Sequence, residues 1–130
     1  MKDVFLRRSE RGAYIIPMLL KDTRFTVTIK AVLLDIGAKG LRCFSNDRRL
    51  RLIPERTLYD KTFRMEFDFF DVDTTGLEGQ VVNVHPGKRE GYERRLGIVF
   101  TNIRPIVARD LNRVVVADAA NAPRAGRTAS

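Results

Sequence analysis

The chain has 130 residues, of which 44% are hydrophobic and 31% charged, and its formal net charge at pH 7 is +8. This length and composition indicate one globular domain. The sequence has neither an apolar run long enough to cross a membrane nor an apolar signal-peptide core after Met1, so we expect a cytoplasmic protein. One cysteine and one histidine exclude an intramolecular disulfide and a Cys/His zinc site. We expect no metal or cofactor, and the positive charge favours an anionic partner.

The first twelve residues indicate a basic arm ahead of the folded domain. They contain the run Arg7-Arg8-Ser9-Glu10-Arg11, in which Arg7 and Arg11 are four residues apart just before an expected strand. Arginine forks bind phosphate oxygens and guanine edges through paired hydrogen bonds. Taken alone, the run fits a solvated arm as well as an anion-binding one, and Arg8 either contributes to such a site or points to solvent.

Most of the chain has the residue alternation of β-strands. The clearest strand is 25–34, where Ile29, Ala31 and Leu33 alternate with polar side chains. Pro17 indicates that the first strand has an open edge or a bulge. Strands are expected over residues 13–20, 25–34, 41–44, 62–69, 77–84 and 92–100. Short strands joined by turns predict a small antiparallel barrel or sandwich.

A glycine-containing turn connects the second and third of these strands. Its sequence, Asp35-x-Gly37-x-x-Gly40, combines a carboxylate with two residues that tolerate positive φ and close backbone approach. Asp35 fits two roles: it caps the turn, or it accepts hydrogen bonds from a bound base or from an arginine of the arm. Lys39 and Arg42 flank the turn and fit either phosphate contacts or a solvated strand face. Free N–H groups at such a turn would suit a small dianionic ligand.

A helix follows the last strand. Val107, Leu111 and Val114 recur at helical spacing, so we expect a helix over 106–116 that packs this apolar face on the barrel. Asn102 is its expected cap.

Two further segments lack a clear period. Residues 46–61 are polar and arginine-rich and predict a long connection, with a possible short strand at 50–53. The predicted organisation is an arm at 1–12, a barrel with its helix at 13–117, and a disordered tail at 118–130.

The two motifs together resemble the PilZ domain, a bacterial receptor domain for cyclic di-GMP. The family pattern is Arg-x-x-x-Arg followed by (Asp/Asn)-x-Ser-x-x-Gly, which Arg7, Arg11, Asp35 and Gly40 match in order. Residues 97–100 supply the Gly-x-x-Phe pattern that is common in the last strand of such domains.

The resemblance implies a fold and a function. The fold is all-β: a six-stranded antiparallel PilZ-like β-barrel with a C-terminal α-helix. The function is a non-catalytic receptor that binds cyclic di-GMP and relays it to a protein partner controlling motility, biofilm or exopolysaccharide output. A mobile arm would close on the ligand against the turn and change the surface shown to the partner. The residues implied to bind cyclic di-GMP are Arg7, Arg8, Arg11, Asp35, Gly37 and Gly40.

The chain departs from the family pattern at Gly37, where the family has serine. A serine hydroxyl can donate a hydrogen bond worth about 0.5–1.5 kcal/mol. Its loss corresponds to a roughly two- to twelvefold weaker affinity, so we expect a dissociation constant on the order of micromolar.

Two alternative functions remain open. The first is an interaction-only PilZ-like module without ligand binding, for which Gly37 is the motive. The second is a basic β-barrel that binds RNA or single-stranded DNA, for which the net charge is the motive. Nucleic-acid barrels usually display stacking aromatics on an open face, whereas Phe63, Phe67 and Phe69 share one apolar parity. Nucleic acid is therefore the less favoured partner.

The sequence contains no complete pattern typical of an enzyme or of a metal site. The sequence has no nucleophile–base arrangement and no Walker-type phosphate loop, so we do not expect an enzyme. Asp71-x-Asp73-x-Thr75-Gly76 resembles the start of an EF-hand loop, but Val82 stands where its glutamate is required. A hairpin turn is predicted there instead.

Overall fold

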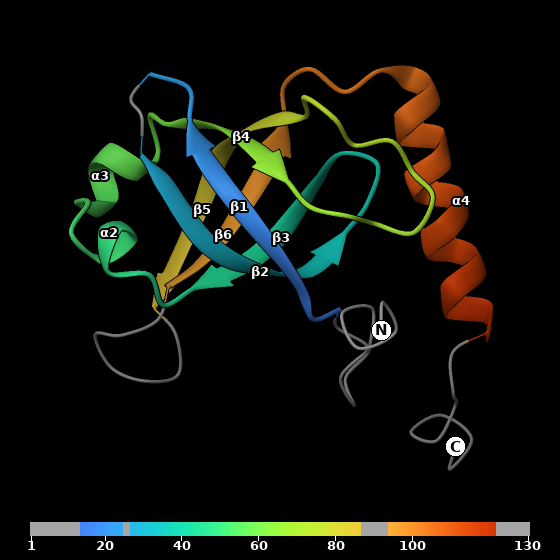
Figure 1. Ribbon diagram of the computed structural model, residues 1–130, viewed down its shortest axis with the longest axis horizontal. Helices are drawn as coiled ribbons and strands as arrows, with labels where there is room; N and C mark the ends of the chain where they lie inside the picture. Colours follow the sequence, from blue (N-terminus) through green and yellow to red (C-terminus); the bar gives the residue numbers. More distant parts are fainter. Residues whose placement is uncertain (1–13, 25–26, 87–93, 122–130) are drawn as a thin grey trace, which may run out of the picture.

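The computed structural model describes residues 14–24, 27–86 and 94–121, which form a closed β-barrel with helices at two opposite ends (Figure 1). The strands are β1 (Ile16–Asp22), β2 (Thr28–Ile36), β3 (Gly40–Ser45), β4 (Thr62–Glu66), β5 (Glu78–Pro86) and β6 (Arg94–Phe100). Their order around the barrel is β1-β2-β3-β6-β5-β4, every pair is antiparallel, and β4 pairs with β1 to close it. The six-stranded antiparallel barrel predicted from the sequence is therefore confirmed.

Alternate side chains of the strands fill the barrel. Along β2, Ile29, Ala31 and Leu33 are buried, as the sequence alternation predicts, while Lys30 and Asp35 are exposed. Cys43 on β3 is fully buried, and this burial raises the pKa of its thiol to about 12. Such a thiol stays protonated and unreactive at neutral pH, so it serves packing alone.

Several strand ends differ from the predictions by one to three residues, among them the ends of β2 and β4. β2 continues to Ile36, so Asp35 lies in a strand. β4 ends at Glu66, three residues before the predicted end at 69. Phe69 is nevertheless buried, in the loop after β4, where its ring packs edge-on against Tyr14 and Phe70. The alternation of apolar residues indicated correctly that Phe69 is buried. Here a loop buries the side chain, and no strand is needed.

Pro17 lies where β1 has a single neighbour. It stands opposite Val32 of β2, and the pairing of β1 with β4 begins only at Leu19. The missing N–H of proline is tolerated at such a position, so the predicted open edge is confirmed. The turn predicted at 71–76 is also present: the N–H of Leu77 donates to the carbonyl of Thr74 at 3.2 Å, and Gly76 has a φ of +76°.

The segment 46–61 contains two short helices, so the possible strand at 50–53 was wrong. They are α2 (Arg48–Arg51) and α3 (Glu55–Leu58). Leu50 and Leu58 are buried, and this burial fixes both helices to the barrel. Pro54 stands directly before α3, a position where its missing N–H leaves no helical bond unmade.

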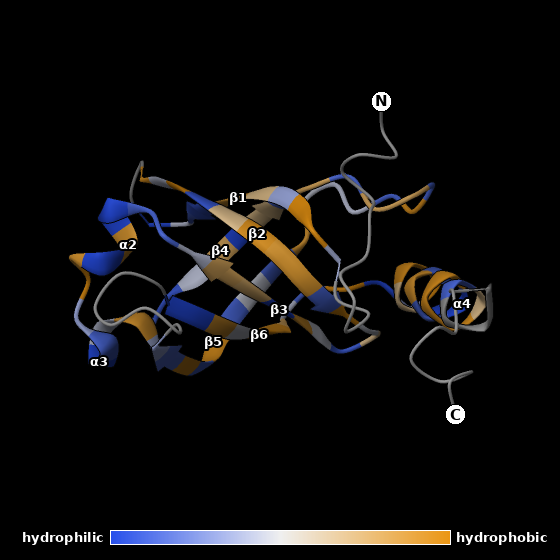
Figure 2. Ribbon diagram, turned by 90° about the horizontal axis from the view of Figure 1, so that it is seen from below, coloured by the Kyte–Doolittle hydropathy of each residue, from blue (hydrophilic) through white to orange (hydrophobic). Residues whose placement is uncertain are grey.

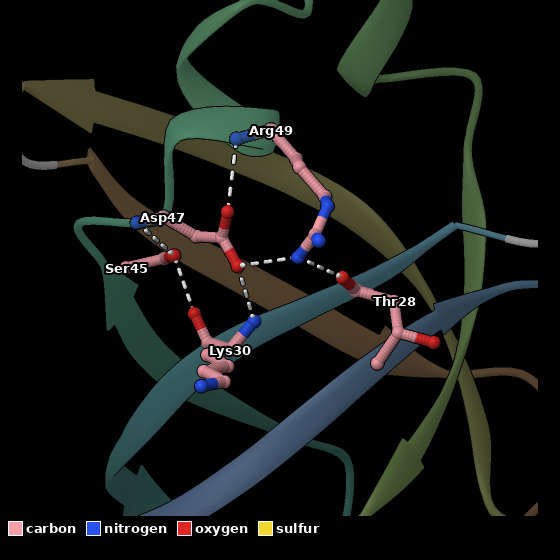
Figure 3. Close-up of polar contacts among 5 residues, drawn as sticks. All are labelled: Thr28, Lys30, Ser45, Asp47 and Arg49. Atoms are coloured by element: carbon pink, nitrogen blue, oxygen red, sulfur yellow. Dashed lines mark hydrogen bonds and ion pairs between the residues drawn. The ribbon is translucent and has the colours of Figure 1, made fainter.

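Asp47 ties the start of α2 to β2 (Figure 3). Its Oδ1 accepts from the N–H of Arg49 at 2.9 Å, which caps α2, and its Oδ2 accepts from the N–H of Lys30 at 2.8 Å. The Ser45 hydroxyl donates to the Lys30 carbonyl at 2.6 Å, and the Arg49 guanidinium donates to the Thr28 carbonyl at 3.2 Å. Because β3 ends at Ser45, these side chains supply the hydrogen bonds that a longer β3 would have made with β2.

This setting also shifts the acidity of Asp47. Burial alone raises the pKa of its carboxyl group. The N–H bonds from Lys30 and Arg49, together with the charges of those residues, outweigh burial and lower the pKa below its ordinary value of 3.8. Asp47 is therefore held as a carboxylate in the folded protein.

α4 (Pro105–Asn121) lies at the end of the barrel away from α2 and α3 (Figure 1, Figure 2). Val107, Leu111 and Val114 are buried, as predicted. The helix runs four residues past the predicted domain end at 117. The Tyr14 hydroxyl donates to Asp118 Oδ2 at 3.1 Å, which anchors this extra turn.

The expected cap of α4 has another role. Asn102 accepts from the N–H of Glu78 at 2.8 Å and donates to the carbonyl of Gly76 at 2.9 Å, so it joins the start of β5 to the preceding turn. Within the described ranges, no helix is both long and apolar enough to cross a membrane. The predicted arm at 1–12 and residues 122–130 of the predicted tail lie outside the described residues.

Candidate ligand-binding site

Three of the six predicted site residues lie together at the turn of the β2–β3 hairpin. Asp35 belongs to β2, and Gly37 and Gly40 bracket the turn that follows it. The three arginines of the N-terminal arm lie outside the described residues. Their contribution to a site therefore remains a prediction.

An open hollow of about 360 Å³ lies beside this turn. The turn and strands β2, β3, β5 and β6 line it. Its polar side chains are Asp35, Lys39, Arg42 and Asn83, and its exposed apolar side chains are Val82 and Val99. The predicted residues Asp35, Gly37 and Gly40 all line this one hollow.

Strand register sets the central row of the hollow. Asp35 stands opposite Arg42, Arg42 opposite Gly97, and Gly97 opposite Asn83, across β2, β3, β6 and β5. Gly97 has no side chain, and a Cβ there would lie 3.1 Å from the Cβ of Asn83. The glycine therefore leaves a depression in the row between Arg42 and Asn83.

Asp35 and Arg42 form an exposed ion pair at the rim. The Arg42 Nη2 donates to Asp35 Oδ2 at 2.6 Å, and the two side chains are 73% and 52% exposed respectively. The carboxylate thus bonds an arginine across the hairpin rather than capping the turn, so the capping role was wrong. Exposed pairs of this kind contribute little to stability, and a ligand can replace either partner.

The two glycines lack the positive φ that was predicted, and only Gly40 shows the predicted close backbone approach. Neither has a positive φ, and the N–H of Gly37 donates to the Gly40 carbonyl at 2.9 Å, so this N–H is not free for a ligand. A Cβ at Gly40 would collide with the carbonyl oxygen of Ile98, so Gly40 is required for the close approach of β3 to β6. A Cβ at Gly37 would meet no atom within 4 Å. Gly37 therefore leaves open space at the rim.

Sequence reasoning missed the residues that β5 contributes to the hollow. The β5–β6 register shifts between Val81 and Asn83, and both Val82 and Asn83 are exposed. A bulge breaks the alternation from which facing is predicted. Val99 had no signal of its own, whereas Gly97 was marked by the Gly-x-x-Phe pattern.

The hollow can hold an anionic ligand that carries a flat polar ring. Val82 and Val99 offer an apolar surface for a ring face, Asp35 offers an acceptor for ring N–H groups, and Lys39 and Arg42 offer positive charge for phosphate. Among the described residues, no group of three or more His, Cys, Asp or Glu side chains is placed to hold a metal ion.

The PilZ domain family model matches residues 5–117 of the chain. One solved structure with the same fold is the PilZ domain with c-di-GMP of YcgR from Escherichia coli. The TM-score is 0.61 at 15% identity, over 90% of this chain and 89% of that one. Another is the Borreliella burgdorferi PlzA protein in complex with c-di-GMP. The TM-score is 0.53 at 10% identity, over 83% of this chain and 46% of that one. No curated protein matches the chain.

Proposed function

The chain belongs to the PilZ domain family, and from that membership we propose that it is a receptor for cyclic di-GMP that binds at the hollow beside the β2–β3 turn. One observation carries the proposal: Asp35 and Gly40, which match the second motif of the family, and Gly37, which stands at its serine position, line a single hollow with two cations and an apolar surface. The two similar structures are both described with this ligand, which supports the same assignment.

The chemistry of the hollow suits a guanine base. Guanine N1–H and N2–H are donors, and Asp35 at the rim is an exposed acceptor that bonds Arg42 alone among the described residues. On binding, the base would take the Asp35 carboxylate and free Arg42 to face a phosphate. Val82 and Val99 would contact the face of the ring. The ligand thus replaces a weak surface pair with bonds that the closed site shields from water.

The N-terminal arm starts within reach of this hollow. The N–H of Tyr14 donates to the carbonyl of Leu34 at 2.7 Å, so the chain at Tyr14 lies beside β2, one residue from Asp35. Three extended residues span at most about 11 Å, and arginine adds a long side chain. The proposal assigns Arg7, Arg8 and Arg11 to the guanine O6 and N7 acceptors and to the phosphate oxygens.

We further propose that the protein acts as a cytoplasmic sensor that catalyses no reaction. Cyclic di-GMP would hold the arm against the barrel, and the new surface would be read by a protein partner that controls motility, biofilm or exopolysaccharide output. This mechanism requires that cyclic di-GMP binds better to the arrangement with the arm against the barrel, since a ligand shifts an equilibrium only through its preference for one state.

Isothermal titration with cyclic di-GMP tests the proposal. We expect wild-type binding with a dissociation constant on the order of micromolar, and no binding of GTP. Arg7→Ala, Arg11→Ala and Asp35→Ala should each weaken binding at least about tenfold, since each removes a charged hydrogen-bonding group. Arg48→Ala, which removes an exposed arginine of α2, is the matched control and should bind as the wild type does.

The absence of binding by the wild type would contradict the receptor proposal. It would favour the alternative in which the chain is an interaction-only PilZ module. The open space at Gly37, where the family has a hydroxyl, is the observation behind that alternative.

A further inference from the structure

α4 has two opposite faces of different composition. Its inner face buries Val107, Leu111 and Val114. On its outer face Ile106 and Val116 are 52% and 58% exposed, which is unusual for branched apolar side chains. Figure 2 views this helix end-on, standing apart at one end of the barrel.

The outer face is a continuous stripe. Ile106, Arg109, Arg113 and Val116 are spaced three, four and three residues apart. At about 100° per residue, these positions fall within about 80° of one another on a helix. We call these four residues the outer stripe. At about 1.5 Å per residue it is about 15 Å long, with apolar ends and a basic centre.

The basic centre of the outer stripe lacks strong internal partners. Arg113 forms one loose pair with Asp110, at 3.9 Å, and its side chain is 60% exposed. Arg109 is exposed and makes no ion pair with any residue in the described ranges. Two positive charges are therefore presented between two apolar contacts.

A second copy of the chain does not fit this face. The outer stripe is symmetric about Leu111, so antiparallel pairing of two copies would set Ile106 against Val116 and Arg109 against Arg113. Parallel pairing would set each arginine against its own copy. Both arrangements place four arginines together at the centre of the contact, where like charges repel.

Other anionic surfaces fit less well than a protein helix. A phosphate backbone would neutralise Arg109 and Arg113 but leave Ile106 and Val116 in water. Recognition of anionic lipid typically uses clusters of about four to eight basic residues, and the outer stripe has two. A helix with apolar residues at the same spacing and carboxylates between them would satisfy all four positions.

We propose that the outer stripe of α4 binds an acidic amphipathic helix of a protein partner. Apolar side chains of the partner pack on Ile106 and Val116, and two carboxylates pair with Arg109 and Arg113. The hollow beside the β2–β3 turn contains no residue of α4, so this surface is separate from the proposed ligand site. The inference does not depend on cyclic di-GMP binding.

Fluorescence anisotropy with designed peptides and the full chain tests the proposal. The probe is a labelled helical peptide with leucine, glutamate, glutamate and leucine at the three-four-three spacing. A peptide of the same composition in scrambled order is one control, and a peptide with lysine in place of glutamate is the other. We expect the wild type to bind the acidic peptide and neither control.

Charge reversal makes the test specific. The Arg109→Glu/Arg113→Glu variant should bind the acidic peptide at least about tenfold more weakly and should acquire binding of the lysine peptide. Arg48→Glu/Arg56→Glu, at the opposite end of the barrel, changes the net charge equally and should bind the acidic peptide as the wild type does.

Three results would overturn the proposal. The first is no binding of the acidic peptide by the wild type, and the second is equal binding of the scrambled peptide. The third is equal loss in the α2–α3 control variant, which would indicate attraction by overall charge. Sedimentation of the wild type with anionic phospholipid vesicles, without peptide binding, would indicate that the outer stripe binds a membrane surface and not a protein partner.

The affinity for cyclic di-GMP should be the same in the Arg109→Glu/Arg113→Glu variant as in the wild type, which separates this surface from the ligand site.

Discussion

Each end of the β2–β3 hairpin carries an aspartate, and the two aspartates are held in opposite ways. At the open end, Asp47 accepts N–H groups from Lys30 and Arg49 at 2.8 and 2.9 Å, and its side chain is 8% exposed. At the turn, Arg42 is the partner of Asp35 within the described part of the chain, and both side chains are mostly in water. Asp47 is engaged in structural hydrogen bonds to the backbone, whereas the exposed carboxylate of Asp35 can exchange its partner for another.

The difference lies in which donors each carboxylate satisfies. Asp47 bonds two backbone N–H groups that no strand or helix carbonyl accepts once β3 has ended, so its removal leaves both donors to water alone. Asp35 bonds a side chain that can return to water at little cost. The same residue type therefore acts as a structural cap at one end of a hairpin and, at the other, stays exposed at the position where we propose that it binds the ligand.

The largest expected effect is on stability, from Asp47→Ala. Loss of the cap and of the acceptor for Lys30 should lower the free energy of unfolding by about 2–4 kcal/mol. Asp35→Ala is the matched control, and it should change stability by less than about 1 kcal/mol. Urea unfolding followed by circular dichroism measures both variants. Equal losses in the two would mean that the contrast between the hairpin ends does not exist.

A smaller effect is expected from pH. The folded-state pKa of Asp47 lies below 3.8, so its stabilising contribution is present above about pH 4 and is lost as pH falls through the folded pKa. The stability difference between the wild type and Asp47→Asn should therefore be largest near neutral pH and shrink below about pH 4. Urea unfolding of both proteins across this range measures it. A difference that is constant with pH would show that the Asp47 charge contributes nothing.

The sequence predicted the strands and the buried face of α4 because buried residues recur at a fixed spacing in both, every second residue in a strand and every three or four residues in a helix. It did not predict α2, since four helical residues carry too little periodicity, and Asp47, which caps them at Arg49, also bonds Lys30, a residue distant in sequence. The same limit applies to the helix end, where Tyr14 bonds Asp118 across 104 residues.

The β2–β3 side of the candidate site was predicted from its motif, but the residues that β5 contributes to the hollow were not. Asp35, Gly37 and Gly40 are close in sequence, so one turn carries all three. Val82 and Asn83 reach the hollow through strand register and a bulge, which no local pattern reports. Of the two reasons predicted for glycine at position 40, the close backbone approach is confirmed at Ile98, whereas the positive φ was wrong.

The smallest expected effect is on affinity, from Gly37→Ser. A Cβ at Gly37 would meet no atom within 4 Å, and the backbone φ there is not positive, so the fold should accept serine without loss of stability. The restored hydroxyl should tighten cyclic di-GMP binding roughly two- to twelvefold, the value of one hydrogen bond.

Gly40→Ser makes the same change three residues on, but collides with the Ile98 carbonyl and should cost about 1–3 kcal/mol of stability. Isothermal titration measures the affinity of both variants and urea unfolding measures their stability. Together they show which of the two glycines affects ligand binding and which affects the packing of the barrel. If Gly37→Ser folds normally and leaves the affinity unchanged, the ligand does not reach this rim of the hollow, and Asp35 loses its assigned role with it.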